Sequence, residues 1–408
     1  MRFRLSEEHE MTRSVIREFA EKEVAPSAGR RDEEERFDRG LWTQMAALGL
    51  TGIPWPERYG GAGSDVLAFA VVVEELSRVC ASTGAALGAH THAGWLIGRY
   101  GGETLKRDCL HPLASGNLLG SCGFPHDIAR KSSADRRHKA PVRAQGVVEG
   151  AAEEAIKKAP SGLEVSFCED DGDFLLNGTF PYVNGAEEAD LFVFHAAGCR
   201  DNRERSARDL TFVTWKETRG ITAGAKKRKL GLRAWPTGEI TFQNKRLSRE
   251  HIIGESELSR EIVLSSHDFR HISDAAQAVG IMQGALEAAV AYAKERKQFG
   301  ERIGRRQGIS FKLADMAAKL DASRLLTYQA AWRLDEGLSC GKEAAAAGAF
   351  SVQAAVASAI EAVQVFGGYG YMREYRVERF LRDAKCLQAN AGEERMRGET
   401  IEQLLADN

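Results

Sequence analysis

Apolar residues recur at helical spacing in the first and last parts of the chain, with short strand-like runs between them. Near the N-terminus, Ser6 is a typical helix-capping residue and two glutamates follow it in the first turn. Pro26 is expected to end this first helix. Its predicted buried face carries apolar residues every four positions, widened by two neighbours: Met11, Val15, Phe19, Ile16 and Ala20. A further apolar helix is predicted from Val66 through Leu76.

The pattern changes between about residues 163 and 247, where short runs of β-branched and aromatic residues alternate with turn residues. Turn signals include the acidic, glycine-containing run 170–173 and the Asn177-Gly178 pair. The predicted strands are 174–178, 191–194, 210–213 and 239–242. This part of the chain therefore predicts a small β domain.

The chain is predicted to be helical again from residue 256. The stretches 275–298 and 344–366 are apolar on most faces, which indicates helices buried against other helices and, by extension, subunit contacts. The order of elements predicts an α+β protein with three parts. These are an N-terminal α-helical domain (1–120), a middle β domain (121–248) and a C-terminal helical bundle (249–408).

The segment 126–162 fits none of these patterns, because it has mixed charge and few large apolar residues. We interpret it as a solvated loop inserted in the β domain. The alternative is a docking patch formed by its basic residues: Arg130, Lys131, Arg136, Arg137, Lys139 and Arg143.

Composition narrows the class of protein. The 408 residues are 43% hydrophobic with a formal net charge of -2, which favours a globular protein and gives no reason to expect nucleic acid or an anionic membrane as partner. The N-terminal residues do not resemble a signal peptide, and no run of about 20 uninterrupted apolar residues predicts a membrane span. Seven dispersed cysteines without a C-x-x-C pair indicate reduced thiols, no metal site and a cytoplasmic protein.

Five strings of the sequence form a recognisable set when taken together. They are 55–61 (WPERYGG) with 74–77 (EELS), 229–233 (KLGLR), 276–281 (AQAVGI), 296–300 (RKQFG) followed by Gln307, and 364–371 (QVFGGYGY) with 382–385 (RDAK). In this order and spacing, from Leu5 to about Lys385, the chain resembles the acyl-CoA dehydrogenases, and most of all the short-chain or butyryl-type bacterial members.

The resemblance implies an N-terminal helical domain, a middle β-barrel-like domain and a C-terminal four-helix bundle. It also implies FAD as cofactor, an acyl-CoA thioester as substrate and a homo- or hetero-tetramer built as a dimer of dimers. An electron-transferring flavoprotein would be the electron acceptor. The activity implied is α,β-dehydrogenation of a short-chain acyl-CoA.

Several residues match the family's FAD-binding motifs. Arg296 offers a bidentate cation for the FAD pyrophosphate, and Gly367 and Gly368 let backbone N–H groups approach the phosphates. For these glycines a helix C-cap turn is the alternative interpretation. The resemblance assigns the remaining FAD contacts to Phe299, Gln307, Gln364, Tyr182 and Asn184. In the family the motifs around Arg296 and Gly367 act partly on the flavin of a neighbouring subunit.

The substrate contacts implied by the resemblance are Asp268, Trp95 and Tyr371. Trp95 follows a segment, 87–94, that resembles the short-chain type around the acyl pocket. It is expected either to close that pocket or to be a core aromatic residue.

The family's chemistry needs a carboxylate base beside the substrate α-carbon. The usual base position, six residues after the lysine of the RDAK string, is Ala391, and the alternative position on an earlier helix is Arg270. Neither residue can accept a proton there. His271 is the best substitute, although a structural role is the alternative. Glu393 and Glu394 are close to Ala391 in sequence and are predicted to face solvent.

Contacts to the flavin ring are also changed. Phe124 and Pro125 stand in a string that carries flavin-binding hydroxyls in the family, and Val183 stands at the position of a threonine that covers the ring. Three hypotheses follow. The chain is a dehydrogenase with a displaced base, a non-catalytic subunit that completes the FAD site of an active paralogue, or a flavoenzyme whose chemistry needs no α-proton base.

Overall fold

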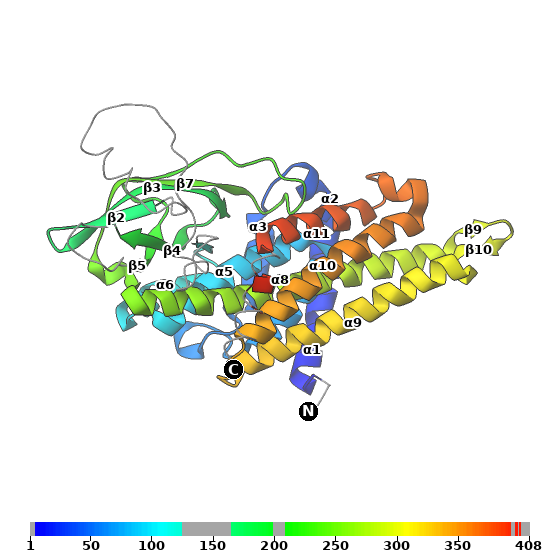
Figure 1. Ribbon diagram of the computed structural model, residues 1–408, viewed down its shortest axis with the longest axis horizontal. Helices are drawn as coiled ribbons and strands as arrows, with labels where there is room; N and C mark the ends of the chain where they lie inside the picture. The colour runs from blue at the N-terminus through cyan, green and yellow to red at the C-terminus, as the bar shows by residue number, and fades with distance from the viewer. Residues whose placement is uncertain (1–4, 125–164, 199–208, 393–395, 399, 401–408) are drawn as a thin grey trace, which may run out of the picture.

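The computed structural model describes residues 5–124, 165–198, 209–392, 396–398 and 400. One sheet lies beside two helical regions, and the elements follow the order helices, strands, helices (Figure 1). This arrangement confirms the predicted α+β class.

The N-terminal region holds six α-helices, and its first helix confirms the predicted cap, because the Ser6 hydroxyl accepts a hydrogen bond from the His9 backbone at 3.2 Å. Before the fourth helix, short 3-10 turns at Leu50–Gly52 and Glu57–Tyr59 carry the chain through the string 55–61. The helices are α1 (Glu7–Phe19), α2 (Ala25–Glu33), α3 (Arg39–Ala47), α4 (Val66–Val79), α5 (Ala81–Tyr100) and α6 (Glu103–Ala114).

Two predictions about the first helix were wrong. Met11 and Val15 are 65% and 52% exposed, although Ile16 and Ala20 of the same predicted face are buried as expected. Pro26 does not end the helical course, because a π-helical turn, η1 (Ala20–Val24), joins α1 to α2. Pro26 lies in the first turn of α2, where its missing N–H leaves no hydrogen bond unmade. Ile16, Ala20 and Val24, spaced four residues apart, are buried along this continuous helical course.

The middle region is an eight-stranded sheet in which β4 occupies a central place. The strands are β1 (Gly120–Gly123), β2 (Val165–Asp170), β3 (Asp173–Asn184), β4 (Leu191–Gly198), β5 (Asp209–Trp215), β6 (Ile221–Ala223), β7 (Thr237–Leu247) and β8 (Ile252–Glu255). Their order is β6-β7-β3-β2-β4-β5-β8, and β1 also pairs with β4. The four predicted strands lie within β3, β4, β5 and β7, and β8 follows the short turn Arg249–His251, so the sheet continues past residue 248.

One edge of β4 receives two separate strands in parallel. β1 pairs along it from Gly120 opposite Leu191 to Gly123 opposite Phe194. β2 takes over on the same strand, with Ser166 opposite Ala197. The chain therefore leaves and re-enters the sheet at neighbouring points of β4.

The C-terminal region is a bundle of four helices, as the resemblance implied: α8 (Ser256–Glu295), α9 (Gln307–Asp335), α10 (Gly341–Phe366) and α11 (Val377–Ala391). A small hairpin of β9 (Lys297–Gln298) and β10 (Glu301–Arg302), with the turn η7 (Ile303–Arg305), joins α8 to α9 and projects from one end of the bundle (Figure 1). The turn η8 (Gly367–Tyr371) joins α10 to α11.

Within the described part of the chain, Gly341–Tyr371 is one helical stretch long and apolar enough to cross a bilayer. Half of its most apolar window is buried, and α10 packs against α8, α9 and α11. It has the contacts of a core helix in a bundle.

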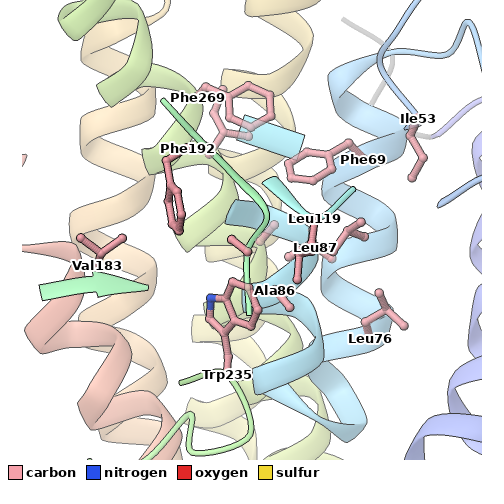
Figure 2. Packing of buried hydrophobic residues seen from close by; sticks show 14 of the residues in the cluster. Ile53, Phe69, Leu76, Ala86, Leu87, Leu119, Val183, Phe192, Trp235 and Phe269 are labelled. Carbon is pink, nitrogen blue, oxygen red and sulfur yellow. The ribbon is translucent and has the colours of Figure 1, made fainter. Parts of the chain in front are cut away.

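A single hydrophobic cluster connects the three regions. Phe69 and Leu87 from the N-terminal helices pack in it with Phe192 and Trp235 of the sheet region and Phe269 of α8 (Figure 2). Because these side chains come from all three regions, the helices and the sheet hold one another in place, and α8 passes through the centre of the contact.

Candidate functional site

The two positions at which the family carries its base lie next to each other in space. Arg270 projects from α8 and its guanidinium donates a hydrogen bond to the backbone carbonyl of Asn390, the residue before Ala391. Ala391 is the last residue of α11 and is fully buried, and Gly392 caps the helix with a φ of 71°. The same guanidinium pairs with Asp274 at 3.5 Å. A cation therefore stands where the expected chemistry needs a carboxylate.

His271, the predicted substitute base, is fully buried on α8. A Cβ added at Gly348 of α10 would lie 3.5 Å from the His271 Cβ, so this side chain faces the interior of the bundle. Its ring is 6.1 Å from that of His267, one turn away. A catalytic role for His271 stays a prediction, and its surroundings favour packing. Glu393 and Glu394 lie outside the described residues.

A column of stacked rings lies beside Arg270. The ring of Phe269 is 5.2 Å from Phe69, 5.0 Å from Trp95 and 5.5 Å from His92. His92 in turn stacks on Phe124 at 6.0 Å. Trp95 therefore has the contacts of a core aromatic residue, the alternative considered from the sequence.

Phe124 brings a ring to the place where the sequence register put flavin-binding hydroxyls. It stacks between His92 and His195, with centroids 6.0 and 6.4 Å away. Burial, together with the positive charge of Arg270, lowers the pKa of His92 to about 3, and burial likewise lowers the pKa of His195 to about 3. Both imidazoles are neutral at physiological pH, and neither can supply a charge to a ligand.

Residues 182–184, which the resemblance places over the flavin ring, lie at the C-terminal end of β3. Tyr182 is largely exposed and the Lys227 ammonium lies 5.2 Å from its ring centroid. Val183 is buried in the same hydrophobic cluster as Trp235 (Figure 2). Gly185 has a φ of 74°, and a Cβ there would come within 2.4 Å of the Trp235 ring, so no other residue fits.

Asn184 is held by two hydroxyls that the sequence did not single out. Thr237 donates to the Asn184 side-chain oxygen at 2.7 Å, and Ser121 donates to its backbone carbonyl at 2.6 Å. Ser121 lies within β1 and Thr237 begins β7, so these contacts to Asn184 could be found only once the strands were paired. These bonds fix the orientation of the predicted FAD-binding amide.

Asp268 and Tyr371, the other predicted substrate contacts, lie in different surroundings. The Cys340 thiol donates to the Asp268 carboxylate at 3.9 Å. Asp268, on α8, therefore lies beside the N-terminal end of α10, which Cys340 caps. Tyr371 is 84% exposed at the end of η8. Their roles toward a substrate stay predictions.

The residues that match the FAD-tail motifs gather on the outside of the bundle. The Arg296 guanidinium lies 5.5 Å from the Tyr369 ring, which joins the hairpin after α8 to the turn η8. Phe299 is 92% exposed at the tip of that hairpin, and the Arg306 guanidinium lies 5.0 Å from its ring. Gln307, the first residue of α9, is exposed at the base of the same hairpin.

The backbone at Gly367 suits a phosphate group. Gly367 ends α10 with a φ of 62°, and a Cβ at either Gly367 or Gly368 would meet nothing within 4 Å. Both the C-cap interpretation and the predicted open approach are therefore consistent with this turn. Gln364, one turn earlier, is exposed on the same helix. The tail residues fit a dinucleotide that approaches from outside the chain, whereas Phe124 and Val183 do not replace the hydroxyls expected at the ring.

Comparison with known proteins gives a consistent answer. The acyl-CoA dehydrogenase N-terminal domain matches residues 6–117 and the C-terminal domain matches residues 261–405. An acyl-CoA dehydrogenase of Bacillus subtilis is 38% identical over 389 residues, 95% of both chains. A short-chain-specific acyl-CoA dehydrogenase of Clostridium acetobutylicum is 36% identical over 394 residues, 96% of both chains.

Solved structures agree with the sequence comparison. Butyryl-CoA dehydrogenase from Megasphaera elsdenii superposes with a TM-score of 0.87 at 32% identity, covering 99% of this chain and all of that one. The likeness extends over the helical regions, the sheet and the connecting turns alike. The chain belongs to the acyl-CoA dehydrogenase family of flavoprotein oxidoreductases.

Proposed function

We propose that this chain is a non-catalytic subunit of an acyl-CoA dehydrogenase assembly and supplies FAD-binding residues to a catalytic relative. The observation that carries the proposal is the contact between Arg270 and the carbonyl of Asn390, beside Ala391. Both base positions meet at this point, and together they present a cation and a methyl group. Proton abstraction at a substrate α-carbon needs an acceptor, and neither residue provides one.

The distribution of retained and altered motifs supports the same conclusion. Arg296, Phe299 and Gly367 are retained, and all lie on the outside of the bundle where a second subunit can reach them. Phe124 and Val183, at positions that would serve the chain's own flavin ring, are apolar. Unsatisfied polar atoms of a buried ring cost about 1–3 kcal/mol each, so tight binding of FAD by this chain alone is not expected.

Arg296, Phe299, Gln307 and the Gly367-Gly368 turn would hold the adenosine and pyrophosphate part of FAD. When bound, FAD supplies the acceptor for the substrate β-hydride. The chain's own contribution is to orient the dinucleotide and to exclude water from the interface. The substrate of the assembly would be a short-chain acyl-CoA, its electron acceptor an electron-transferring flavoprotein, its form a tetramer and its location the cytoplasm.

The test compares the chain alone with the chain co-expressed with a catalytic family member from the same organism. We expect the purified chain to be colourless and the co-purified assembly to absorb between about 350 and 500 nm. Arg296→Ala should lower the flavin content of the assembly, and Arg305→Ala, an exposed arginine of the same turn region, should leave it unchanged. A yellow homotetramer whose flavin is reduced by butyryl-CoA would overturn the proposal and favour dehydrogenation by the chain itself.

A further inference from the structure

A cleft rich in arginine lies on the surface beside the FAD-tail residues and has no part in the function proposed above. It is a shallow depression that is open to solvent. Its walls come from α2, from the loop that precedes β7 and from the start of α11, and α2 and α11 lie side by side (Figure 1). Its arginines are Arg233, Arg373, Arg376, Arg379 and Arg382.

Only one of these arginines is fully compensated by acids of the cleft. The Arg382 guanidinium donates hydrogen bonds to two carboxylates of the cleft. These bonds go to Asp32 at 3.2 and 2.6 Å and to Glu378 at 2.5 and 2.9 Å. Asp32 and Glu378 are therefore both paired with Arg382. Glu33 is the third acid in the lining, and five arginines against three acids leave a net charge of +2 (5 − 3 = 2).

The other guanidinium groups keep donors available. The Arg233 Nε donates to the carbonyls of Lys229 and Leu230, both at 3.2 Å, which leaves its terminal nitrogens directed elsewhere. Arg373 and Arg376 are exposed, and neither forms an ion pair with any described residue. Arg379 is buried and donates one nitrogen to the Val79 carbonyl at 2.9 Å.

The guanidinium group of arginine can bind phosphate through two parallel hydrogen bonds. The Arg233, Arg373 and Arg376 groups around one open cleft therefore match a ligand with two or more negative charges. We propose that this cleft is a binding site for a phosphate-bearing anion of the pyrophosphate or nucleotide-diphosphate class. The site is separate from the FAD-tail residues, although Tyr369, which lies under Arg296, is 5.1 Å from Tyr375, the residue before Arg376.

Thermal unfolding of the full chain in pyrophosphate tests this proposal, with sodium chloride at matched ionic strength as reference. About 10 mM pyrophosphate should raise Tm by at least about 2 °C over the chloride reference, because a ligand bound only by the native state stabilises it. The Arg373→Gln/Arg376→Gln variant should lose this rise and unfold normally in chloride, since both side chains are exposed. Arg305→Gln, which removes an exposed arginine elsewhere, should keep it.

A further variant separates the cleft from the flavin motif. Arg296→Ala should retain the pyrophosphate response even though it is expected to lower flavin content in the assembly, so the two proposals can fail independently. The cleft proposal is overturned if pyrophosphate gives no more stabilisation than chloride, or if Arg296→Ala removes the response. It is also overturned if the Arg373/Arg376 variant responds like the native chain, which would leave these arginines as contacts for acidic groups of another subunit.

Discussion

The Arg270 guanidinium donates a hydrogen bond to the backbone carbonyl of Asn390, across 120 residues of sequence. This contact joins α8 to the end of α11 at the point where the family's two base positions meet. It has a direct consequence for any attempt to restore the base.

Ala391→Glu alone should not restore dehydrogenation of butyryl-CoA. A carboxylate placed beside Arg270 would form an ion pair, and the cation would lower the carboxylate pKa and weaken it as a base. Ala391→Glu combined with Arg270→Ser should be faster than the single variant by roughly 100-fold, the lower range for general-base catalysis. The rate of flavin reduction measures this in an assembly whose catalytic relative carries glutamine in place of its own base, with Ala391→Gln/Arg270→Ser as control. Equal rates in the single and double glutamate variants would show that Arg270 does not suppress the base.

Gly367→Ala should destabilise the chain, whereas Gly368→Ala should have little effect. Gly367 has a φ of 62° and a ψ of -136°, a conformation that costs other residues about 1–3 kcal/mol. Space is not the cause, because neither added Cβ would meet an atom within 4 Å. Denaturant unfolding of both variants separates the backbone effect from crowding, and equal losses of stability would contradict the explanation.

Glu74→Gln should destabilise the chain by about 3 kcal/mol, because the partly buried Arg324 guanidinium then keeps only Asp321, which is 75% exposed, as an ion-pair partner. Glu74 is buried and accepts hydrogen bonds from Arg324 at 2.8 and 3.0 Å and from the Tyr328 hydroxyl. The Glu74→Gln/Arg324→Gln double variant should recover part of the loss, since no uncompensated charge remains. Chemical denaturation of the native chain, the two single variants and the double variant gives the coupling free energy between Glu74 and Arg324. A coupling free energy near zero would mean that the ion pair contributes little to stability.

Asp383→Asn should change the pH dependence of stability. Burial raises the pKa of Asp383 from 3.8 to about 6, while the Leu232 N–H bonds its side chain at 2.7 Å. The folded state therefore holds the proton more tightly than the unfolded state, and ionisation destabilises the fold as pH rises from about 4 through 6. Asparagine keeps an acceptor for Leu232 and has no proton to lose.

Relative to the native chain, the Asp383→Asn variant should gain up to about 3 kcal/mol between pH 4 and pH 7. Urea unfolding at several pH values measures the difference. A constant difference across this range would show that the native carboxyl titrates normally.

Much of the fold follows from the sequence because its signals are local. Ser6 caps its helix through a bond to a residue three positions away, and the four predicted strands, which are short apolar runs between turn residues, lie within β3, β4, β5 and β7. The burial of α1 was not predictable in the same way. Its apolar stripe includes Met11 and Val15 as well as Ile16, and only the packing of α1 against α4 shows that Ile16 is buried while the other two are exposed.

The candidate site depends on contacts that sequence spacing cannot supply. Counting along the chain placed Ala391 and Arg270 as two separate alternatives, whereas folding brings them to one point. The hydroxyls of Ser121 and Thr237 meet Asn184 only after three strands pair. The stack of Phe124 on His92 likewise joins residues whose chemistry, taken singly, indicates no common place.

The shared edge of β4 has a consequence for how the gene can vary. Gly123 pairs with Phe194 and Ser166 with Ala197, so the two points of attachment are three residues apart on one strand, or about 10 Å. Since closing a span between two near points costs little more for a long connection than for a short one, the sheet tolerates large changes in the length of what joins them. Changes in the length of the segment between Gly123 and Val165 can therefore accumulate while β1 and β2 keep their described pairings with β4.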